Sequence, residues 1–250
     1  MDGALRKATP LLILAAIWAA ASRGLDSPMF PSPIDVGAAL ARAAASGELP
    51  RAVARTGLRL VVGYAVALAV GVCLGVVLAR APRLRRAIAP LLHGLSGVPS
   101  VCWLPLSVLW FGLSEAAIQV VVVVGAALPI ASATEAAVRQ VPPIVDRAAR
   151  AMGARGPSLL FRVLLPAAMP GITSGARLGW TFALRSLMAG ELLFVSGGLG
   201  QLLEAGRDLG DAALVLGVVV VIVALGRAVE TTVFGRVDRA VARRWGTVAA

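Results

Sequence analysis

The chain has 250 residues, of which 58% are hydrophobic and 15% charged, and its mean hydropathy is +0.86. This hydropathy is far above that of a soluble domain of similar length, so the composition indicates an integral membrane protein and excludes an ordinary soluble enzyme. The formal net charge of +11 does not indicate nucleic-acid binding, because the arginines fall in short stretches between apolar segments.

Long uninterrupted apolar runs predict an all-helical, polytopic membrane protein with about six transmembrane helices, in which residues 1–250 form a single transmembrane domain. The runs Val120–Ala133 and Ala212–Leu225 lack the alternation that a membrane β-strand requires. The predicted spans are Pro10–Ser22, Thr56–Ala79, Ile88–Gly112, Ala116–Thr134, Gly171–Ser196 and Ala212–Val229.

The first predicted span is short, and it follows the basic residues Arg6 and Lys7 in the way that a signal peptide would. No convincing small-residue cleavage site precedes Arg23. We therefore expect Pro10–Ser22 to be retained as a span, although its length lies at the lower edge of what a membrane requires.

A short helix is predicted between the first two spans. Ser32-Pro33-Ile34-Asp35 provides a capping residue, a proline at the first helical position and an acid in the first turn. The helix should run to about Ser46 and stop at Gly47, with a weak apolar stripe of Val36, Leu40, Ala43 and Ala44. It could pack at the membrane interface or contact a binding protein.

Basic residues divide unequally between the two sides that these spans define. Because Lys and Arg concentrate on the cytoplasmic side, both termini are expected to be cytoplasmic. The predicted inner side holds sixteen, namely Arg6, Lys7, Arg80, Arg83, Arg85, Arg86, Arg139, Arg147, Arg150, Arg155, Arg162, Arg227, Arg236, Arg239, Arg243 and Arg244; the outer side holds six, namely Arg23, Arg42, Arg51, Arg55, Arg59 and Arg207.

The segment between the fourth and fifth spans has the composition of a docking element for another protein. Arg147-Ala148-Ala149 is followed after three residues by Gly153, and after nine more by Val163-Leu164-Leu165-Pro166. Gly153 permits the left-handed geometry that ends a helix. The small Ala148 and Ala149 would allow close approach by a partner, and Met152 would supply an adaptable apolar contact.

This spacing resembles the EAA loop in permease subunits of ATP-binding-cassette importers, where Glu-Ala-Ala, then Gly, then Ile-x-Leu-Pro form the cytoplasmic coupling helices. Arg147 replaces the glutamate, which the nitrate, sulfonate and taurine branch often lacks. The literal Glu-Ala-Ala that begins at Glu135 fails the spacing, because Val141 lies where glycine is needed and Pro142-Pro143 interrupts any helix.

Further segments resemble the same branch, in the same order along the chain. They are Thr56–Tyr64 with Gly71 and Gly75, Pro99–Pro105 with Trp110-Phe111-Gly112, and Gly198-Leu199-Gly200. The resemblance runs from about Ser32 to Trp245 and implies the type I, MetI-like permease fold.

The resemblance also implies partners and functional residues. Residues 135–170 would contain the cytoplasmic coupling loop, with ATPase coupling by Arg147, Ala148, Ala149, Met152, Gly153, Leu165 and Pro166. Two ATPase subunits, a second copy of this chain, an extracytoplasmic solute-binding protein and membrane lipid would be its partners, and no nucleic acid. The chain would lie in the bacterial cytoplasmic (inner) membrane.

The chain itself is expected to be a non-catalytic subunit without a cofactor. Its only lysine is Lys7, which lies far from any glycine-rich turn, so it cannot carry a standard P-loop. ATP and Mg²⁺ would be bound by the separate ATPase subunit. His93 has no neighbouring residues that would form a catalytic group with it, and no metal site is predicted.

Four polar residues within or beside the spans are candidates for the translocation pathway: Ser100, Gln119, Arg185 and Glu191. A charge within a span costs about 2.5 to 3.5 kcal/mol on insertion scales, so such residues usually face protein or water. Arg185 could attract an anion or pair with a neighbouring helix. Glu191 fits a structural or gating role better than solute binding.

Two groups of small residues are predicted to serve packing. Gly171, Gly175 and Gly179 recur every four residues and would allow close approach of another helix. Cys73 and Cys102 are expected to be small core residues, because no second cysteine lies near either.

Taken together, the sequence predicts the permease subunit of an ATP-driven importer for a small solute, favouring an oxyanion of the sulfonate, taurine or nitrate type because of Arg185. One alternative is the same architecture with another solute, such as a pyrimidine precursor or an amino acid. Others are an ATP-independent secondary carrier or channel, against which the docking segment argues, and a membrane scaffold.

Overall fold

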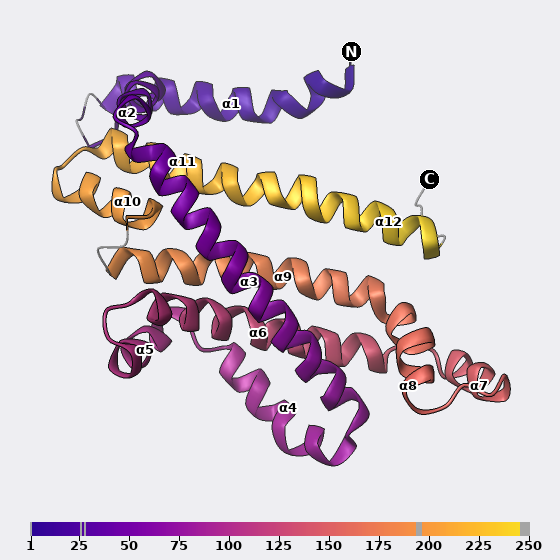
Figure 1. The fold of residues 1–250 in the computed structure, drawn as a ribbon. Helices are drawn as coiled ribbons and strands as arrows, with labels where there is room; N and C mark the ends of the chain where they lie inside the picture. The colour runs from indigo at the N-terminus through magenta and orange to yellow at the C-terminus, as the bar shows by residue number, and fades with distance from the viewer. Residues whose placement is uncertain (1, 26, 28, 194–196, 246–250) are drawn as a thin grey trace. The chain divides into compact units, whose positions relative to one another are not determined.

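The computed structural model describes residues 2–25, 27, 29–193 and 197–245, and every regular element in these ranges is a helix, which confirms the predicted all-helical class. The helices are α1 Asp2–Leu25, α2 Pro33–Ala45, α3 Glu48–Arg80, α4 Pro82–Ser96, η1 Ser100–Trp103, α5 Leu104–Phe111, α6 Glu115–Arg139, α7 Pro143–Ala151, α8 Gly156–Leu159, η2 Leu160–Leu164, α9 Leu165–Leu193, α10 Leu199–Asp208, α11 Ala212–Val229, η3 Glu230–Phe234 and α12 Gly235–Trp245 (Figure 1).

Within the described residues, four helical segments are long and apolar enough to cross a membrane: Glu48–Arg80, Glu115–Arg139, Gly156–Leu193 and Ala212–Arg243. They contain the predicted second, fourth, fifth and sixth spans, apart from the end of the fifth at Ser196, which lies outside the described residues. The predicted span Pro10–Ser22 lies in α1, but several of its side chains are also outside the described part, so its spanning character stays a prediction.

The predicted third span, Ile88–Gly112, is not one continuous helix. The structure divides it into α4 and the η1–α5 segment, which together are apolar enough to span but are bent by 105° at the break. The break falls at Gly97, Val98 and Pro99, and Pro99 is extended with ψ 133°. Hydropathy alone predicts a single span here, because it does not register that proline lacks the N–H of a continuing helix.

The chain forms two compact units, and each is described by itself. The first comprises residues 1–56 and 191–224. Its α2 has the predicted start, since Ser32 and Asp35 form a reciprocal capping box, and Gly47 follows its end with φ +77°. The helix buries Val36, Ala39 and Ala43, so the predicted apolar stripe was only partly right.

In the second unit, residues 57–190 and 225–250, α6 packs between α3 and α9. A Cβ at Gly175 would lie 2.5 Å from the Cβ of Ala133, and one at Gly171 would lie 2.5 Å from that of Ala137. On the other side, a Cβ at Gly75 would lie 2.5 Å from the Ala131 carbonyl oxygen. The prediction that the α9 glycines serve close packing is confirmed, and the glycines of α3 do the same.

Aromatic residues join α3, α9 and η3 within the second unit. Tyr64 on α3 packs edge-to-face against Trp180 on α9, with ring centroids 5.3 Å apart, and both lie near Phe234. The Tyr64 hydroxyl donates to the Ala176 carbonyl oxygen at 2.8 Å. Arg177, a second arginine of α9, forms an ion pair with Asp238. These contacts tie the C-terminal helix to the spans.

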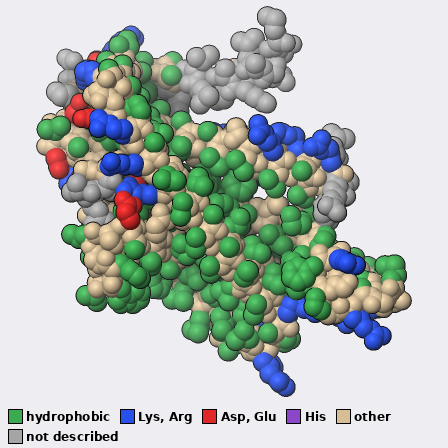
Figure 2. Space-filling model, in the orientation of Figure 1, with side chains coloured by type: hydrophobic (Ala, Val, Ile, Leu, Met, Phe, Trp, Pro, Cys, Tyr) green, Lys and Arg blue, Asp and Glu red, His purple; other side chains and the backbone are tan. Residues whose placement is uncertain are grey.

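Hydrophobic side chains cover much of the surface in Figure 2. In the span Ala212–Arg243, only 11% of the most apolar window is buried within the chain. Cys73 and Cys102 are both exposed, so the prediction that they are core residues was wrong. The reason is that the apolar faces of helices that span a membrane need not be buried within the chain itself.

Candidate functional site

The predicted docking segment folds as α7, a sharp turn and α8 (Figure 1). Pro143 occupies the first turn of α7, where its missing N–H costs nothing. Asp146 lies in the same turn and accepts a hydrogen bond from Arg150 Nε at 2.9 Å. This bond holds the pKa of the Asp146 carboxyl below its usual value, so the acid stays ionised at the positive end of the helix.

Gly153 ends α7 in the way that its place in the motif predicts. Its φ is +88°, and its N–H donates to the Arg150 carbonyl at 3.0 Å. The N–H of Ala154 donates to the Ala149 carbonyl at 2.9 Å. This pair of bonds is a Schellman motif, which needs a left-handed residue at the position of Gly153.

One face of α7 is exposed along its whole length. It comprises Ile144, Arg147, Ala148, Ala151 and Met152, which recur at helical spacing. Met152 is 81% exposed and Ile144 is 62% exposed, so this face presents large apolar side chains beside a basic one. We call these five residues the α7 face. An apolar and small-residue surface of this kind is suited to contact with another protein.

The opposite face of α7 holds the segment together. Ala149 is 2% exposed and packs with Leu159 and Leu164 in a small core. Leu165 packs against the cluster that contains Ala137 and Ala168, and Pro166 is half-buried at the start of α9. Of the seven predicted coupling residues, the structure therefore exposes Arg147, Ala148 and Met152 on one face, places Gly153 in the turn, and turns the other three inward.

The literal Glu-Ala-Ala at Glu135 lies inside α6. Glu135 is 5% exposed, and its carboxylate lies 3.1 Å from Arg139 and 3.6 Å from Arg85. It is an internal ion-pair partner and is not available for docking, in agreement with its wrong spacing.

Glu191, one of the predicted pathway residues, is fully buried in the first unit. Its carboxylate accepts a hydrogen bond from the Thr56 hydroxyl at 2.8 Å and one from the Gly200 N–H at 3.0 Å. Thr56 Oγ1 in turn accepts from the Leu199 N–H at 2.8 Å. Thr56 and Glu191 thus satisfy the first N–H groups of α10, which have no partner within that helix.

The glycines of Gly198-Leu199-Gly200 are required by this arrangement. A Cβ at Gly198 would collide with the Glu191 carboxylate, and one at Gly200 would lie 2.5 Å from Glu191 Cβ and 2.9 Å from its carbonyl carbon. The sequence analysis singled out both Glu191 and Gly198-Leu199-Gly200, but nothing in the sequence indicated that they contact each other.

Gln119, another predicted pathway residue, lies in the contact between α6 and α3. Its Nε2 donates to the Arg59 carbonyl oxygen at 3.2 Å, and Gly63 leaves room for its side chain. Arg59 is 7% exposed and donates from Nε to Glu115 at 2.7 Å. These residues join α3 to α6, and Gln119 does not line the cavity that contains the remaining two.

Ser100 and Arg185 do come together. They line a cavity of about 230 Å³ in the second unit, between the α4–η1 break, α6 and α9. The other lining residues are Leu95, Ser96, Gly97, Val98, Pro99, Trp103, Gly125, Leu128 and Phe182. Sequence reasoning missed Gly125 and Phe182, because an apolar residue within a span carries no signal of a neighbouring cavity.

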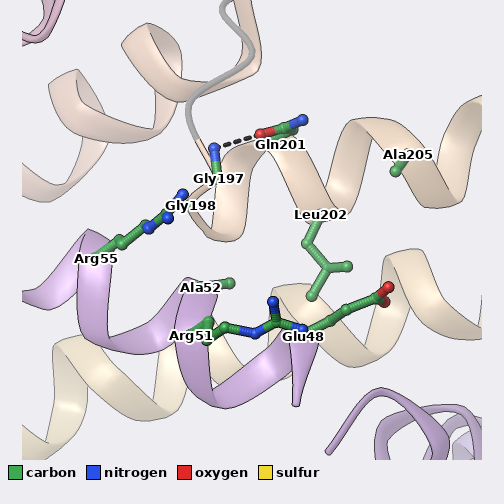
Figure 3. A pocket seen from close by; sticks show the side chains of 9 residues that line it. All are labelled: Glu48, Arg51, Ala52, Arg55, Gly197, Gly198, Gln201, Leu202 and Ala205. Carbon is green, nitrogen blue, oxygen red and sulfur yellow. Dashed lines mark hydrogen bonds between the residues drawn. The ribbon is translucent and has the colours of Figure 1, made fainter. Parts of the chain in front are cut away.

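A second hollow, of about 320 Å³, lies in the first unit beside the start of α10 (Figure 3). Its polar groups largely serve local structure. Arg51 donates to the carbonyls of Gly47 and Ser46 at 2.7 and 3.2 Å. Gln201 accepts from the Gly197 N–H, and Arg55 points toward the same glycine (Figure 3). Gln201 and Arg55 thus lie against Gly197, directly before α10.

Comparison with known proteins places the whole arrangement in one family. Residues 71–246 match the family described as binding-protein-dependent transport system inner membrane component. The chain is 29% identical over 220 residues to the taurine transport system permease protein TauC of Escherichia coli, covering 85% of this chain and 80% of TauC. It is 36% identical over 182 residues to the glycine betaine/proline betaine transport system permease protein ProW of the same organism.

The ProW match covers 71% of this chain but only 51% of ProW, so the chain spans about half the length of that relative. Among solved structures, a chain of the inward-facing MetNI methionine ABC transporter superposes with a TM-score of 0.68 at 28% identity, covering 78% of this chain and 96% of that chain. The likeness confirms the predicted MetI-like fold, and TauC confirms the predicted branch. The chain belongs to the family of binding-protein-dependent transport system inner membrane components.

Proposed function

We propose that this chain is the permease subunit of an ATP-driven importer for a small oxyanion of the sulfonate class, and that two copies form the translocation pathway. Two ATPase subunits would bind the α7 face, and an extracytoplasmic binding protein would deliver the solute. The similarity to TauC supports the solute class, because its name assigns it to taurine transport. Both termini would be cytoplasmic, since the basic residues concentrate on that side.

The α7 face is the single observation that carries this proposal. A helix with Met152 81% exposed and small alanines beside it has its own core on the other side, so the exposed face is not needed for folding. After the turn at Gly153, α7 is followed by one long helical segment, Gly156–Leu193, which is apolar enough to span a membrane, and α7 packs against its Leu159 and Leu164. A displacement of α7 by a partner would therefore be passed to α9 as a rigid-body movement.

Substitution of Gly153 tests the coupling role. A Cβ at Gly153 meets nothing within 4 Å, so Gly153→Val adds only backbone strain, about 1 to 2 kcal/mol for a side chain in left-handed geometry. We expect the strain to reorient α7 and to uncouple ATP hydrolysis from transport while the subunit stays folded. The measurement is solute transported per ATP hydrolysed by the reconstituted importer.

Gly210→Val is the matched control, because Gly210 also has positive φ and open space around it but lies far along the chain from α7. It should carry similar strain and leave the transport ratio unchanged. Undiminished transport per ATP in Gly153→Val would contradict the coupling assignment.

A second solute class is a betaine, in which a quaternary ammonium accompanies a carboxylate instead of a sulfonate, and the similarity to ProW favours it, because that name refers to betaine transport. The two classes are separated by ATPase stimulation in the complex with its binding protein. We expect taurine, methanesulfonate or nitrate to stimulate hydrolysis. Stimulation by glycine betaine or methionine, and by none of taurine, methanesulfonate and nitrate, would replace the oxyanion assignment.

A further inference from the structure

Arg185 is a charged residue within a spanning helix, and among the described residues it forms no hydrogen bond or ion pair. It lies eight residues before Leu193, the last residue of α9, which is about 12 Å along the helix. By contrast Arg177, on the same helix, is paired with Asp238. An unpaired guanidinium at this depth would be costly unless it faced water or an anion.

The cavity that Arg185 lines could hold the water or anion that its guanidinium requires. Its floor and walls come from three separate elements: the α4–η1 break at Gly97–Ser100, α6 at Gly125 and Leu128, and α9 at Phe182 and Arg185. The 105° bend at the break turns backbone and the Ser100 side chain toward α6, where a continuous helix would have passed by. The cavity of about 230 Å³ has room for a small organic ion.

Ser186 gives an independent indication of a ligand. It is fully buried, and its hydroxyl has no hydrogen-bond partner. It lies directly against Gly125, which lines the cavity, since a Cβ at Gly125 would collide with Ser186 Oγ and lie 3.2 Å from Ser100 Cβ. A buried hydroxyl without a partner costs about 1 to 3 kcal/mol. A bound anion would accept its hydrogen bond.

The remaining walls are apolar and partly aromatic. Trp103 and Phe182 line the cavity with Leu95, Val98 and Leu128. The lining contains one charged side chain, Arg185, and the hydroxyls of Ser96 and Ser100, while Ser186 lies directly behind Gly125. A cation and hydroxyls within otherwise apolar walls suit a solute with one oxyanion group and a short organic part. A guanidinium can donate two parallel hydrogen bonds to a planar or tetrahedral oxyanion, which fixes its orientation.

We propose that this cavity is a solute-binding site within the permease itself, in which Arg185, Ser186 and Ser100 bind the sulfonate group while Trp103 and Phe182 contact the organic part. The inference rests on the proposed import of a sulfonate-class oxyanion. The site lies in the half of α9 remote from the docking segment, so solute contact and ATPase contact occupy opposite ends of one helical segment.

The test uses the reconstituted importer with its binding protein and radiolabelled taurine. Arg185→Gln should lower taurine transported per ATP by about tenfold or more, because charge-assisted bonds are lost, and Arg185→Lys should fall between that variant and the unaltered protein. Ser186→Ala should lower it several-fold.

Ser186→Ala separates a solute contact from a structural role. Removal of an unpartnered buried hydroxyl should leave the thermal stability of the complex unchanged or raised, while taurine transport falls. The double variant Arg177→Gln/Asp238→Asn is the charge control, since it removes an arginine from the same helix together with its partner. It should retain transport per ATP.

Three outcomes would overturn the inference. The first is unchanged taurine transport per ATP in both Arg185→Gln and Ser186→Ala. The second is an equal loss in the Arg177/Asp238 control. The third is loss of the two-copy assembly in Arg185→Gln, measured by light scattering, which would make Arg185 a subunit contact. Failure of the unaltered importer to transport taurine, methanesulfonate or nitrate would instead refute the proposed function.

Discussion

Glu191 shows how a single buried carboxylate can join residues of three helices. Its hydrogen bonds to Thr56 and Gly200 connect the end of one span to the start of α10 and to the residue that begins the apolar part of α3. The same carboxylate fills the space that Gly198 leaves open. The motif residues Thr56, Gly198 and Gly200 are thus explained by one contact.

Glu191→Ala is expected to destabilise the protein. The Thr56 hydroxyl and the Gly200 N–H would each lose a buried acceptor, at about 1 to 3 kcal/mol per group. For a chain of this size a loss of 1 kcal/mol lowers Tm by about 2 to 4 °C, so Tm should fall by at least several degrees. Thermal unfolding in detergent measures the change.

Glu204→Ala provides the comparison for this prediction. Glu204 lies on α10 and pairs with Arg207, whose side chain is 66% exposed, and an ion pair of that kind contributes about 0 to 1 kcal/mol. Equal Tm values for the two variants would show that the Glu191 contacts do not stabilise the protein.

For single residues, the sequence indicated the important charged side chains but did not indicate which residues they contact. Arg185 and Glu191 were singled out because charged residues are rare in spans. In the structure, Arg185 lines a cavity and Glu191 is fully buried. Ser186 gave no signal, because a serine within an apolar helix usually bonds to its own backbone. Its significance depends on Gly125, which is distant in sequence.

Between elements, the packing of α6 depends on glycines of its neighbours. Gly75 faces the backbone of α6, with a would-be Cβ 2.5 Å from the Ala131 carbonyl oxygen and 3.0 Å from the Glu135 nitrogen. Backbone atoms in the middle of a helix cannot move aside alone. The two helices would have to separate to admit a methyl group.

Gly75→Ala should therefore destabilise the protein by about 1 to 3 kcal/mol. Gly57 lies on the same helix with nothing within 4 Å of its would-be Cβ. Gly57→Ala should be neutral or stabilising by up to about 1 kcal/mol, because alanine favours helix over glycine. Unfolding of both variants in denaturant with detergent measures the difference, and a smaller loss in Gly75→Ala than in Gly57→Ala would contradict the packing scheme.

Element boundaries were predictable where local chemistry sets them. The bounds of α11 agree with the predicted span Ala212–Val229, and α2 begins at the predicted cap. The third predicted span failed because its apolar character continues through Gly97–Pro99, and only the backbone chemistry of glycine and proline there marks the 105° bend. Hydropathy indicates whether a segment prefers lipid or water, but it contains no information on where the helix axis bends.

For the molecule as a whole, the fold and the helix–turn–helix of the docking segment were easier to predict from the sequence than the proposed solute site. The docking motif is a local pattern of about twenty consecutive residues, so its spacing can be recognised in the sequence alone. The cavity around Arg185 is lined by residues of four helices, α4, η1, α6 and α9, and no linear pattern connects them. The literal Glu-Ala-Ala at Glu135 was correctly rejected because its spacing, like its burial, is wrong for docking.

The predicted orientation follows from sixteen basic residues on one side against six on the other. It places Ser158, in α8, inside the cell and Ser46, at the end of α2, outside; both are exposed. Cysteines introduced singly at these positions would report their side, after replacement of the exposed Cys73 and Cys102 by alanine. A membrane-impermeant maleimide applied to intact spheroplasts distinguishes the two.

We expect Ser46→Cys to react in intact spheroplasts and Ser158→Cys to react only after the membrane is permeabilised. The parent without cysteine should remain unlabelled and so sets the background. Labelling of Ser158→Cys before permeabilisation would place the α7 face outside, where no ATP is available to a partner ATPase. That result would overturn the orientation and the coupling role together, since a docking surface for an ATP-driven partner is useful only on the side that contains ATP.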